Sequence, residues 1–325
     1  MLQGYALKSI SAERHSNTGP VSQEARTGAA FMDAAPSISC PFNTPVYAQG
    51  LAHLGIVQPD SHGQFAILRR AIPGTAFSDG ISPWPYLWIT GPDMIEALHR
   101  DFRDLVTLTV LCQPGYVPDP TSCDAPLLKH HFVYDPKLPC PPLSRRARAR
   151  VEDCARHATF EIVTEAVERL VISSLYDALK RRRGLAYGLF DMDRSHFEAI
   201  AALEGSRFFR VRSGGQIGAM ACGVTFGDWL QILHTVPTED GLRWNASYFL
   251  MHGLQTFARE QDVLLLTGGM PAGGTPGLHV FKSRWANHME PVHMIRIIND
   301  RATHAALCNQ SGGASDYFPA YRNPL

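Results

Sequence analysis

Residues 207–236 read RFFRVRSGGQIGAMACGVTFGDWLQILHTV, and they are followed by NASYFLMHGLQTFAREQ at 245–261 and by VLLL at 263–266. Turn residues interrupt the first stretch at Ser213-Gly214-Gly215 and at Gly227-Asp228, which predicts a three-stranded antiparallel meander. The second stretch has apolar residues at helical spacing and begins with an asparagine, a typical N-cap, which predicts an amphipathic helix. The four apolar residues of the third stretch indicate a buried strand.

A glycine-rich bend, GGMPAGG at 268–274, follows this strand and is not expected to continue it. The segment ends with a short helix, LHVFKSRW at 278–285, and a last strand at 291–298. Residues 207–298 therefore predict a core of mixed strands and helices. They contain no nucleophile motif and no metal-binding motif, so chemistry at this core would depend on how substrates are positioned.

The chain of 325 residues is long for one domain and suits two. Hydrophobic residues make up 45% and charged residues 18% of it, and the formal net charge is +0 with a pI near 7.2. This balance gives no global field that would attract nucleic acid or an anionic membrane. We therefore expect phosphate contacts to be local, and we expect no DNA partner.

Seven cysteines occur without a CxxC pair, which indicates reduced thiols in a cytosolic protein. The N-terminus lacks the apolar segment of a secretion signal, and the chain has no run of about 18 apolar residues. We therefore expect a cytoplasmic protein without a membrane span.

The chain before residue 207 is predicted to contain further strands and helices. Residues 1–36 are rich in Ser, Ala, Gly, Thr and Glu and are expected to form a flexible tail. The composition changes after Pro139-Cys140-Pro141-Pro142, which is a candidate domain boundary. We predict strands at 65–70, 105–111, 130–134 and 160–163, helices at 93–103, 144–156, 167–182 and 195–203, and a loop with an edge strand at 77–91.

Four stretches resemble the Fem-type transferases, the FemA and FemX relatives among the acyltransferases of GNAT fold. The most specific stretch is Gly277 to Trp285, which contains Phe281-Lys282. The other three are the basic helix from Ser144 to His157 with the following Phe160-Glu161-Ile162, Leu175-Tyr176 to Gly184 with Phe197, and Asn245-Ala246-Ser247-Tyr248-Phe249.

The resemblance implies an α/β fold with mixed sheets and two tandem GNAT-like domains. The first would span residues 37–143, with residues 301–325 returning to it, and the second, carrying the donor site, would span residues 144–300. The resemblance also implies an N-acyltransferase that moves an aminoacyl group from aminoacyl-tRNA to an amine. The acceptor would be a small molecule, a peptide or a peptidoglycan precursor, in a natural-product or cell-wall setting, and no cofactor is expected.

Two departures from the family pattern bear on this hypothesis. No stretch sustains heptads long enough for the coiled-coil arm of some members. The loop with which ordinary GNAT enzymes bind the CoA pyrophosphate is also missing, since the corresponding residues 240–245 contain one glycine. An acyl-CoA-dependent N-acyltransferase of the same fold and a non-catalytic binding module remain as alternatives.

Lys282 is the main candidate catalytic residue, because a lysine near a glycine-rich bend can contact a phosphate or a developing oxyanion. Tyr248, Glu239 and Asp240 are candidates for the general base, and the sequence does not choose among them. Glycine amides at the bend can approach a phosphate or a carboxylate. The candidate donor-binding residues are Phe281, Asn245, Ser247, Gly268, Gly269, Gly277, Arg243 and His234.

The aromatic and basic groups each have two interpretations. Trp84, Tyr86 and Tyr176 either line an acceptor cleft or pack in the core. The two basic clusters either contact tRNA phosphates or form solvated helix faces. The histidines at 130, 131, 288 and 293 fit no ligand spacing, so no metal site is expected. The candidate phosphate-binding residues of the basic clusters are Arg145, Arg146, Arg181 and Arg182.

Overall fold

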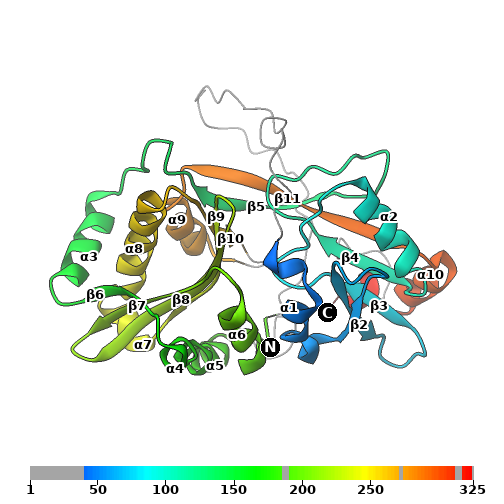
Figure 1. Ribbon diagram of the computed structural model, residues 1–325, viewed down its shortest axis with the longest axis horizontal. Coiled ribbons are helices and arrows are strands. Elements are labelled where there is room, and N and C mark those ends of the chain that lie inside the picture. Colours follow the sequence, from blue (N-terminus) through cyan, green and yellow to red (C-terminus); the bar gives the residue numbers. More distant parts are fainter. Residues whose placement is uncertain (1–39, 185–189, 271–273, 312–316, 324–325) are drawn as a thin grey trace.

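A mixed sheet joins the two halves of the chain in the computed structural model, which describes residues 40–184, 190–270, 274–311 and 317–323 (Figure 1). Neighbouring strands are antiparallel except for the parallel pairs β3–β4 and β9–β10. The predicted tail at 1–36 lies outside the described residues. In pairing order the strands are β1 (Ile56–Pro59), β2 (Ala66–Ala71), β3 (Ser78–Ile81), β4 (Thr107–Leu111), β11 (His288–Ile298), β5 (Leu127–Tyr134), β10 (Leu264–Gly269), β9 (Trp229–Pro237), β8 (Gln216–Phe226), β7 (Ser206–Ser213) and β6 (Thr159–Ile162).

Helices cover both faces of the sheet. Among the described residues they are α1 (Pro45–Gln49), α2 (Pro92–Asp101), α3 (Arg145–Ala155), α4 (Ala166–Arg169), α5 (Val171–Arg183), α6 (Arg194–Ala202), α7 (Glu239–Arg243), α8 (Ala246–Glu260), α9 (Pro276–Ser283) and α10 (Arg301–Gln310). In the half with β6 to β10, α3, α8 and α9 lie on one face and α4, α5 and α6 on the other (Figure 1). Each face buries its own apolar cluster, which contains Leu250 and Leu254 of α8 on one side and Ile172 and Ile200 of α5 and α6 on the other.

The element order predicted for residues 207–298 is confirmed. β7, β8 and β9 form the antiparallel meander, α8 follows, and β10, α9 and β11 complete the segment. The α/β class with a mixed sheet is confirmed as well. The strands of this segment are rich in apolar residues because helices cover them from both sides.

Several local predictions differ from the structure. β3 pairs with β2 and β4 on its two sides, so it is an interior strand and not the edge strand expected within 77–91. An aspartate and a glycine weaken the strand pattern there, and the pairing of the aspartate described below explains why it is tolerated. The helix expected at 167–182 is divided into α4 and α5 near Leu170. β1, α7 and α10 were not predicted from the sequence, and β1 and α7 are short.

β11 connects the two halves of the sheet. Its residues 294–298 pair with β4, and its residues 288–293 pair with β5. β5 precedes the predicted boundary at residue 143, while β10 and β11 belong to the predicted second domain. Strand pairing therefore crosses the predicted boundary, and the division into two domains stays a prediction.

A buried carboxylate in β3 holds the C-terminal segment of the chain. Asp79 is fully buried and forms ion pairs with Nε of Arg70 at 3.1 Å and with Nε of Arg322 at 2.7 Å. Arg322 also donates to the carbonyl oxygen of Ala71 at 2.7 Å. A buried carboxylate is destabilising unless it is paired, so these arginines fix the end of the chain against β2 and β3.

We expect the substitution Arg322→Met to lower the free energy of unfolding by about 3 kcal/mol, because it leaves a buried charge with one partner fewer. Urea denaturation followed by circular dichroism measures this change. The matched control is Arg194→Ala, which removes an ion pair with Glu198 at 2.7 Å between largely exposed side chains and should cost less than about 1 kcal/mol. Equal effects of the two substitutions would contradict the assignment.

Candidate active site

The parallel pairing of β9 and β10 is short, and the sheet opens where it ends. The paired residues are Leu264 with Trp229, Leu265 with Leu230, and Leu266 with Gln231. β9 continues to residue 237, whereas β10 ends at residue 269. The edge of β9 beyond residue 231 is therefore not paired with β10, so its backbone groups there do not bond to that strand.

Gln231 and Tyr86 meet at the point where the strands diverge. The hydroxyl of Tyr86 donates to Oε1 of Gln231 at 3.0 Å, and both side chains are buried. Nε2 of Gln231 donates to the carbonyl oxygen of Ile232 at 2.7 Å and to that of Leu266 at 3.4 Å. The predicted acceptor residue Tyr86 thus reaches the opening from the first half of the chain. Sequence reasoning missed Gln231, although a lone amide in an apolar strand was a usable signal.

Lys282 approaches the same end of β10 from helix α9. The hydroxyl of Thr275 caps this helix, and Pro276 occupies its first position, which suits the fixed φ of proline. Nζ of Lys282 donates to the carbonyl oxygens of Thr267 at 3.0 Å and Gly269 at 2.8 Å. Burial, followed by the nearby charge of Lys129, lowers the pKa of Lys282 to about 8. An ammonium group therefore stands at the C-terminal end of β10, beside the glycine bend.

The glycine bend begins within β10 and not after it. The prediction that the strand stops before residue 268 was wrong, because the strand extends to Gly269, which pairs with His131 of β5 after a shift in register. A side chain at Gly269 would place its Cβ 2.7 Å from the carbonyl oxygen of His130 and 2.9 Å from Cδ of Lys129. Gly268 has a φ of 77°, which favours glycine. The two glycines thus let β5 and α9 approach the same point.

Tyr248, Phe281 and Ser247 form a second group of candidates among α3, α8 and α9. The hydroxyl of Tyr248 accepts hydrogen bonds from Arg150 at 2.5 Å and Arg284 at 3.0 Å. The ring of Phe281 lies 5.2 Å from that of Tyr248, and Oγ of Ser247 is buried without a hydrogen-bond partner among the described residues. These contacts point to the core beside α8, whereas Lys282 points to β10.

The prediction that the side chain of Asn245 caps α8 was wrong. It precedes the helix with a φ of 63° and makes no side-chain capping hydrogen bond. An asparagine tolerates this left-handed conformation, which turns the chain from α7 into α8. Asn245 is therefore a turn residue at the beginning of α8.

Arg243 belongs to residues 240–245, where the resemblance to GNAT enzymes predicts the position of their pyrophosphate loop. It is exposed and forms ion pairs with Glu239 at 3.1 Å and Asp240 at 2.8 Å within α7. The backbone amide of Gly241 donates to the hydroxyl of Thr238 at 2.9 Å, and a Cβ at Gly241 would lie 1.8 Å from the carbonyl oxygen of Gly218. This amide is satisfied within the protein, and α7 packs closely on β8.

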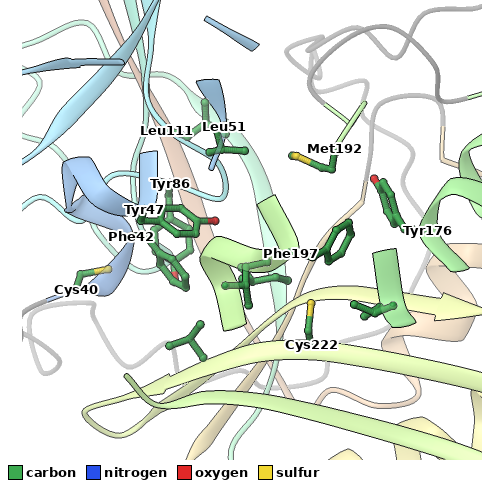
Figure 2. Close-up of a cluster of buried hydrophobic side chains, with 14 of the residues drawn as sticks. Cys40, Phe42, Tyr47, Leu51, Tyr86, Leu111, Tyr176, Met192, Phe197 and Cys222 are labelled. Carbon is green, nitrogen blue, oxygen red and sulfur yellow. The ribbon is translucent and has the colours of Figure 1, made fainter. Parts of the chain in front are cut away.

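His234 lies in an aromatic cluster away from Lys282. Its Nε2 is 2.9 Å from Nε2 of His196, and the ring of Trp84 stacks on it at 4.8 Å. The ring centroid of Tyr176 is 4.9 Å away, and burial lowers the pKa of His234 to about 3. Figure 2 shows Tyr176 and Phe197 on one side of this core and Tyr86 among aromatic residues from the first half on the other. The predicted acceptor residues are thus brought together, with His234, in a packed core.

The two basic clusters lie on opposite faces of the sheet. Arg145 and Arg146 are exposed on α3, and Arg181 and Arg182 are exposed at the end of α5 (Figure 1). Nη2 of Arg182 donates to the carbonyl oxygen of Pro237 at 3.1 Å. One flat phosphate backbone cannot lie along both faces, so the two clusters are separate surfaces.

Two features of the described residues concern metals and membranes. In the described ranges, no group of three or more His, Cys, Asp and Glu side chains is placed to hold a metal ion. Among the helices that the structure describes, none combines the length and apolar character that crossing a membrane requires.

The two glycines at residues 269 and 277 are predicted to respond differently to alanine. Gly269→Ala should lower the free energy of unfolding by about 1–3 kcal/mol, because its new Cβ meets backbone and a lysine side chain. Gly277→Ala is the matched control: the nearest atom to its Cβ would be 3.9 Å away, and alanine favours a helix over glycine by up to about 1 kcal/mol. Thermal denaturation distinguishes the two, and a stable Gly269→Ala variant would contradict the close approach of β5.

Comparison with known proteins gives similarity of structure alone. No family profile matches the chain, and no curated protein matches it in sequence. The crystal structure of FemX matches with a TM-score of 0.58 and 11% identity, over 86% of this chain and 97% of FemX. L-PGS from Bacillus licheniformis matches with a TM-score of 0.56 and 14% identity, over 80% of this chain and 88% of that structure.

A third solved structure extends this likeness. The C-terminal domain of a putative lysylphosphatidylglycerol synthetase from Agrobacterium fabrum matches with a TM-score of 0.54 and 16% identity, over 89% of this chain and 99% of that domain. These matches span most of both chains in each comparison, at identities that establish the fold only. The chain therefore has the fold of FemX, as its resemblance to the Fem-type transferases predicted.

Proposed function

We propose that the protein is an N-acyltransferase that moves an aminoacyl group from aminoacyl-tRNA to the amine of a small molecule, a peptide or a peptidoglycan precursor. The observation that carries this proposal is the opening between β9 and β10, with the ammonium group of Lys282 held at the end of β10 at 3.0 Å and 2.8 Å from two carbonyl oxygens. The shared fold with FemX supports the same class of reaction.

The geometry fits a reaction driven by alignment. Backbone amides at the unpaired edge of β9 would hold the acyl carbonyl, and Lys282 would anchor a phosphate of the donor. The amine nitrogen attacks the carbonyl carbon, the C–N bond forms, and the ester C–O bond to the ribose breaks. An aminoacyl ester is so reactive that aligning the amine with the ester carbonyl supplies most of the rate acceleration.

The packing of α7 favours tRNA over CoA as the donor. The amide of Gly241 is bonded to Thr238, and Gly241 rests on Gly218, so the glycine amide of this turn is not free to bind a pyrophosphate. An acyl-CoA enzyme of this fold would need a pyrophosphate site beside β9. Acyl-CoA therefore remains the second candidate donor, and a binding module without turnover the third hypothesis.

Incubating the purified protein with a pool of radiolabelled aminoacyl-tRNAs and a panel of amines and peptidoglycan precursors tests the proposal. We expect a labelled amide that disappears when the tRNA is digested with RNase before the reaction. Product formed from acyl-CoA and not from tRNA would overturn the assigned donor.

Substitution of Lys282 by Met should lower kcat/KM by about 10²–10³-fold, the effect of removing one cationic or oxyanion contact. Lys137→Met, at an exposed lysine, should leave the rate unchanged.

The basic cluster on α3 is predicted to be the one that contacts tRNA. Arg150 of α3 and Arg284 share the hydroxyl of Tyr248, which ties this cluster to the helix of Lys282. Replacing Arg145 and Arg146 together by Ser should weaken tRNA binding and lower the slope of log K against log salt by about one to two. The paired substitution of Arg181 and Arg182 by Ser is the control, and filter binding at several salt concentrations measures both. A larger effect in the α5 variant would reverse the assignment.

A further inference from the structure

We propose that Lys129 accepts the proton from the attacking amine and returns it to the leaving oxygen. This inference rests on the proposed function, and it names a residue that the sequence analysis did not single out. Lys129 lies on β5, next to the glycine bend and opposite Val292 of β11. Its side chain passes within 2.9 Å of the position that a Cβ at Gly269 would take.

Two lysines thus approach one point from different elements. Lys282 comes from α9 and is held by carbonyl oxygens of residues 267 and 269, while Lys129 comes from β5 and lies against residue 269. Val133, Leu266 and Gln231 are directly paired across three strands and therefore share one sheet face. Lys129 is four residues from Val133 on the same strand and projects to that face, which also holds the hydroxyl of Tyr86 at the opening.

Lys129 and Lys282 differ in what their ammonium groups contact. Lys282 donates two hydrogen bonds to fixed carbonyl oxygens, which favour its charged form. Across the described ranges, no hydrogen bond or ion pair reaches Nζ of Lys129. A lysine without a carboxylate or carbonyl partner, next to a second ammonium group, is the one that gives up its proton more readily.

The other candidate bases already bond to arginine side chains. Glu239 and Asp240 form ion pairs with Arg243 on the exposed helix α7. The hydroxyl of Tyr248 accepts from two arginines, which oppose its use as a proton acceptor. Among the described residues beside β10, Nζ of Lys129 and Nδ1 of His131 both lack a hydrogen-bond partner. The pKa of His131 is held well below its usual range by burial and then by the two lysine charges, which makes its imidazole the weaker base and leaves Lys129 as the better proton acceptor.

The surroundings of Lys129 keep its neutral form available. Burial lowers its pKa to about 8, and burial, followed by the charges of Lys129 and Lys282, holds the pKa of His131 well below its usual range. On β11, Glu290 bonds to His288 at 2.6 Å, and Nδ1 of His293 lies 2.9 Å from the carbonyl oxygen of Ala125. These acidic and imidazole groups of the neighbouring strand therefore have partners of their own.

The proposed step conserves protons. Neutral Nζ of Lys129 accepts one proton from the amine nitrogen as the C–N bond to the acyl carbon forms. The resulting ammonium group then donates that proton to the ribose oxygen as the ester C–O bond breaks. The products are an amide and a free ribose hydroxyl, and Lys129 returns to its neutral state.

The rate of the full-length enzyme as a function of pH tests this role. The wild type should show kcat/KM rising with pH and levelling near pH 8. Both Lys129→Met and Lys129→Arg should lower kcat by about 10²-fold or more and lose this plateau, with KM nearly unchanged, because arginine keeps the charge and cannot release its proton. Lys137→Met, at an exposed lysine, is the matched control and should retain the wild-type profile.

Competitive acylation of lysines, read by mass spectrometry, gives a second measurement that does not depend on activity. Lys129 of the wild type should become reactive with a midpoint near pH 8, against about 10.4 for a lysine model peptide added as standard. Reactivity of Lys129 that follows the standard would overturn the assignment, as would a Lys129→Arg variant with full activity and an unchanged plateau. A wild type that forms no amide from any donor would instead overturn the proposed function.

Discussion

The architecture depends on one constraint, the early end of the parallel pairing between β9 and β10. Three residue pairs join these strands before they diverge. The divergence requires Gly268, whose backbone is left-handed, and Gly269, which has no room for a side chain beside β5. A longer pairing would fill the opening with hydrogen bonds and would leave no unpaired backbone edge for a substrate.

The two halves of the chain each contribute to this opening. Tyr86 from the first half bonds to Gln231, which in turn reaches the carbonyl oxygen of Leu266 on β10. β11 then passes from β5 to β4, so its backbone fixes the distance between the halves. A site built across such a continuous sheet is held by many backbone hydrogen bonds, which favours catalysis by positioning over catalysis by a mobile group.

The sequence predicted the fold better than it predicted the site. The meander, α8 and β11 follow from turn residues and apolar periodicity, which are local signals. The glycines at 268 and 269 marked the bend, and Lys282 was placed correctly beside it. The residues that these predictions concern have contacts with residues close to them in the sequence, as Lys282 has with Thr267 and Gly269.

The missed residues depend on contacts between distant segments. His131 lies in the strand predicted at 130–134 and Lys129 lies just before it, and only the pairing of β5 with β10 brings them to the bend. His234 lies in a separate aromatic core because Trp84 and His196 pack on it from residues far away in the chain. Periodicity gives the face of a strand but not its neighbours, so sheet order could not be read from the pattern.

The electrostatics of the bend follow from the same geometry. Lys129 and Lys282 both have pKa values near 8, against about 10.4 for a free lysine, because burial disfavours their charged forms. Between these two pH values the unfolded chain binds protons that the folded protein does not. The two lysines therefore make the free energy of unfolding rise with pH between about 8 and 10.4, and below about pH 8 they lower it. A negative charge between them offsets this cost. The oxyanion that develops when an amine attacks an ester supplies such a charge only in the transition state, which is where an acyltransferase gains most from it.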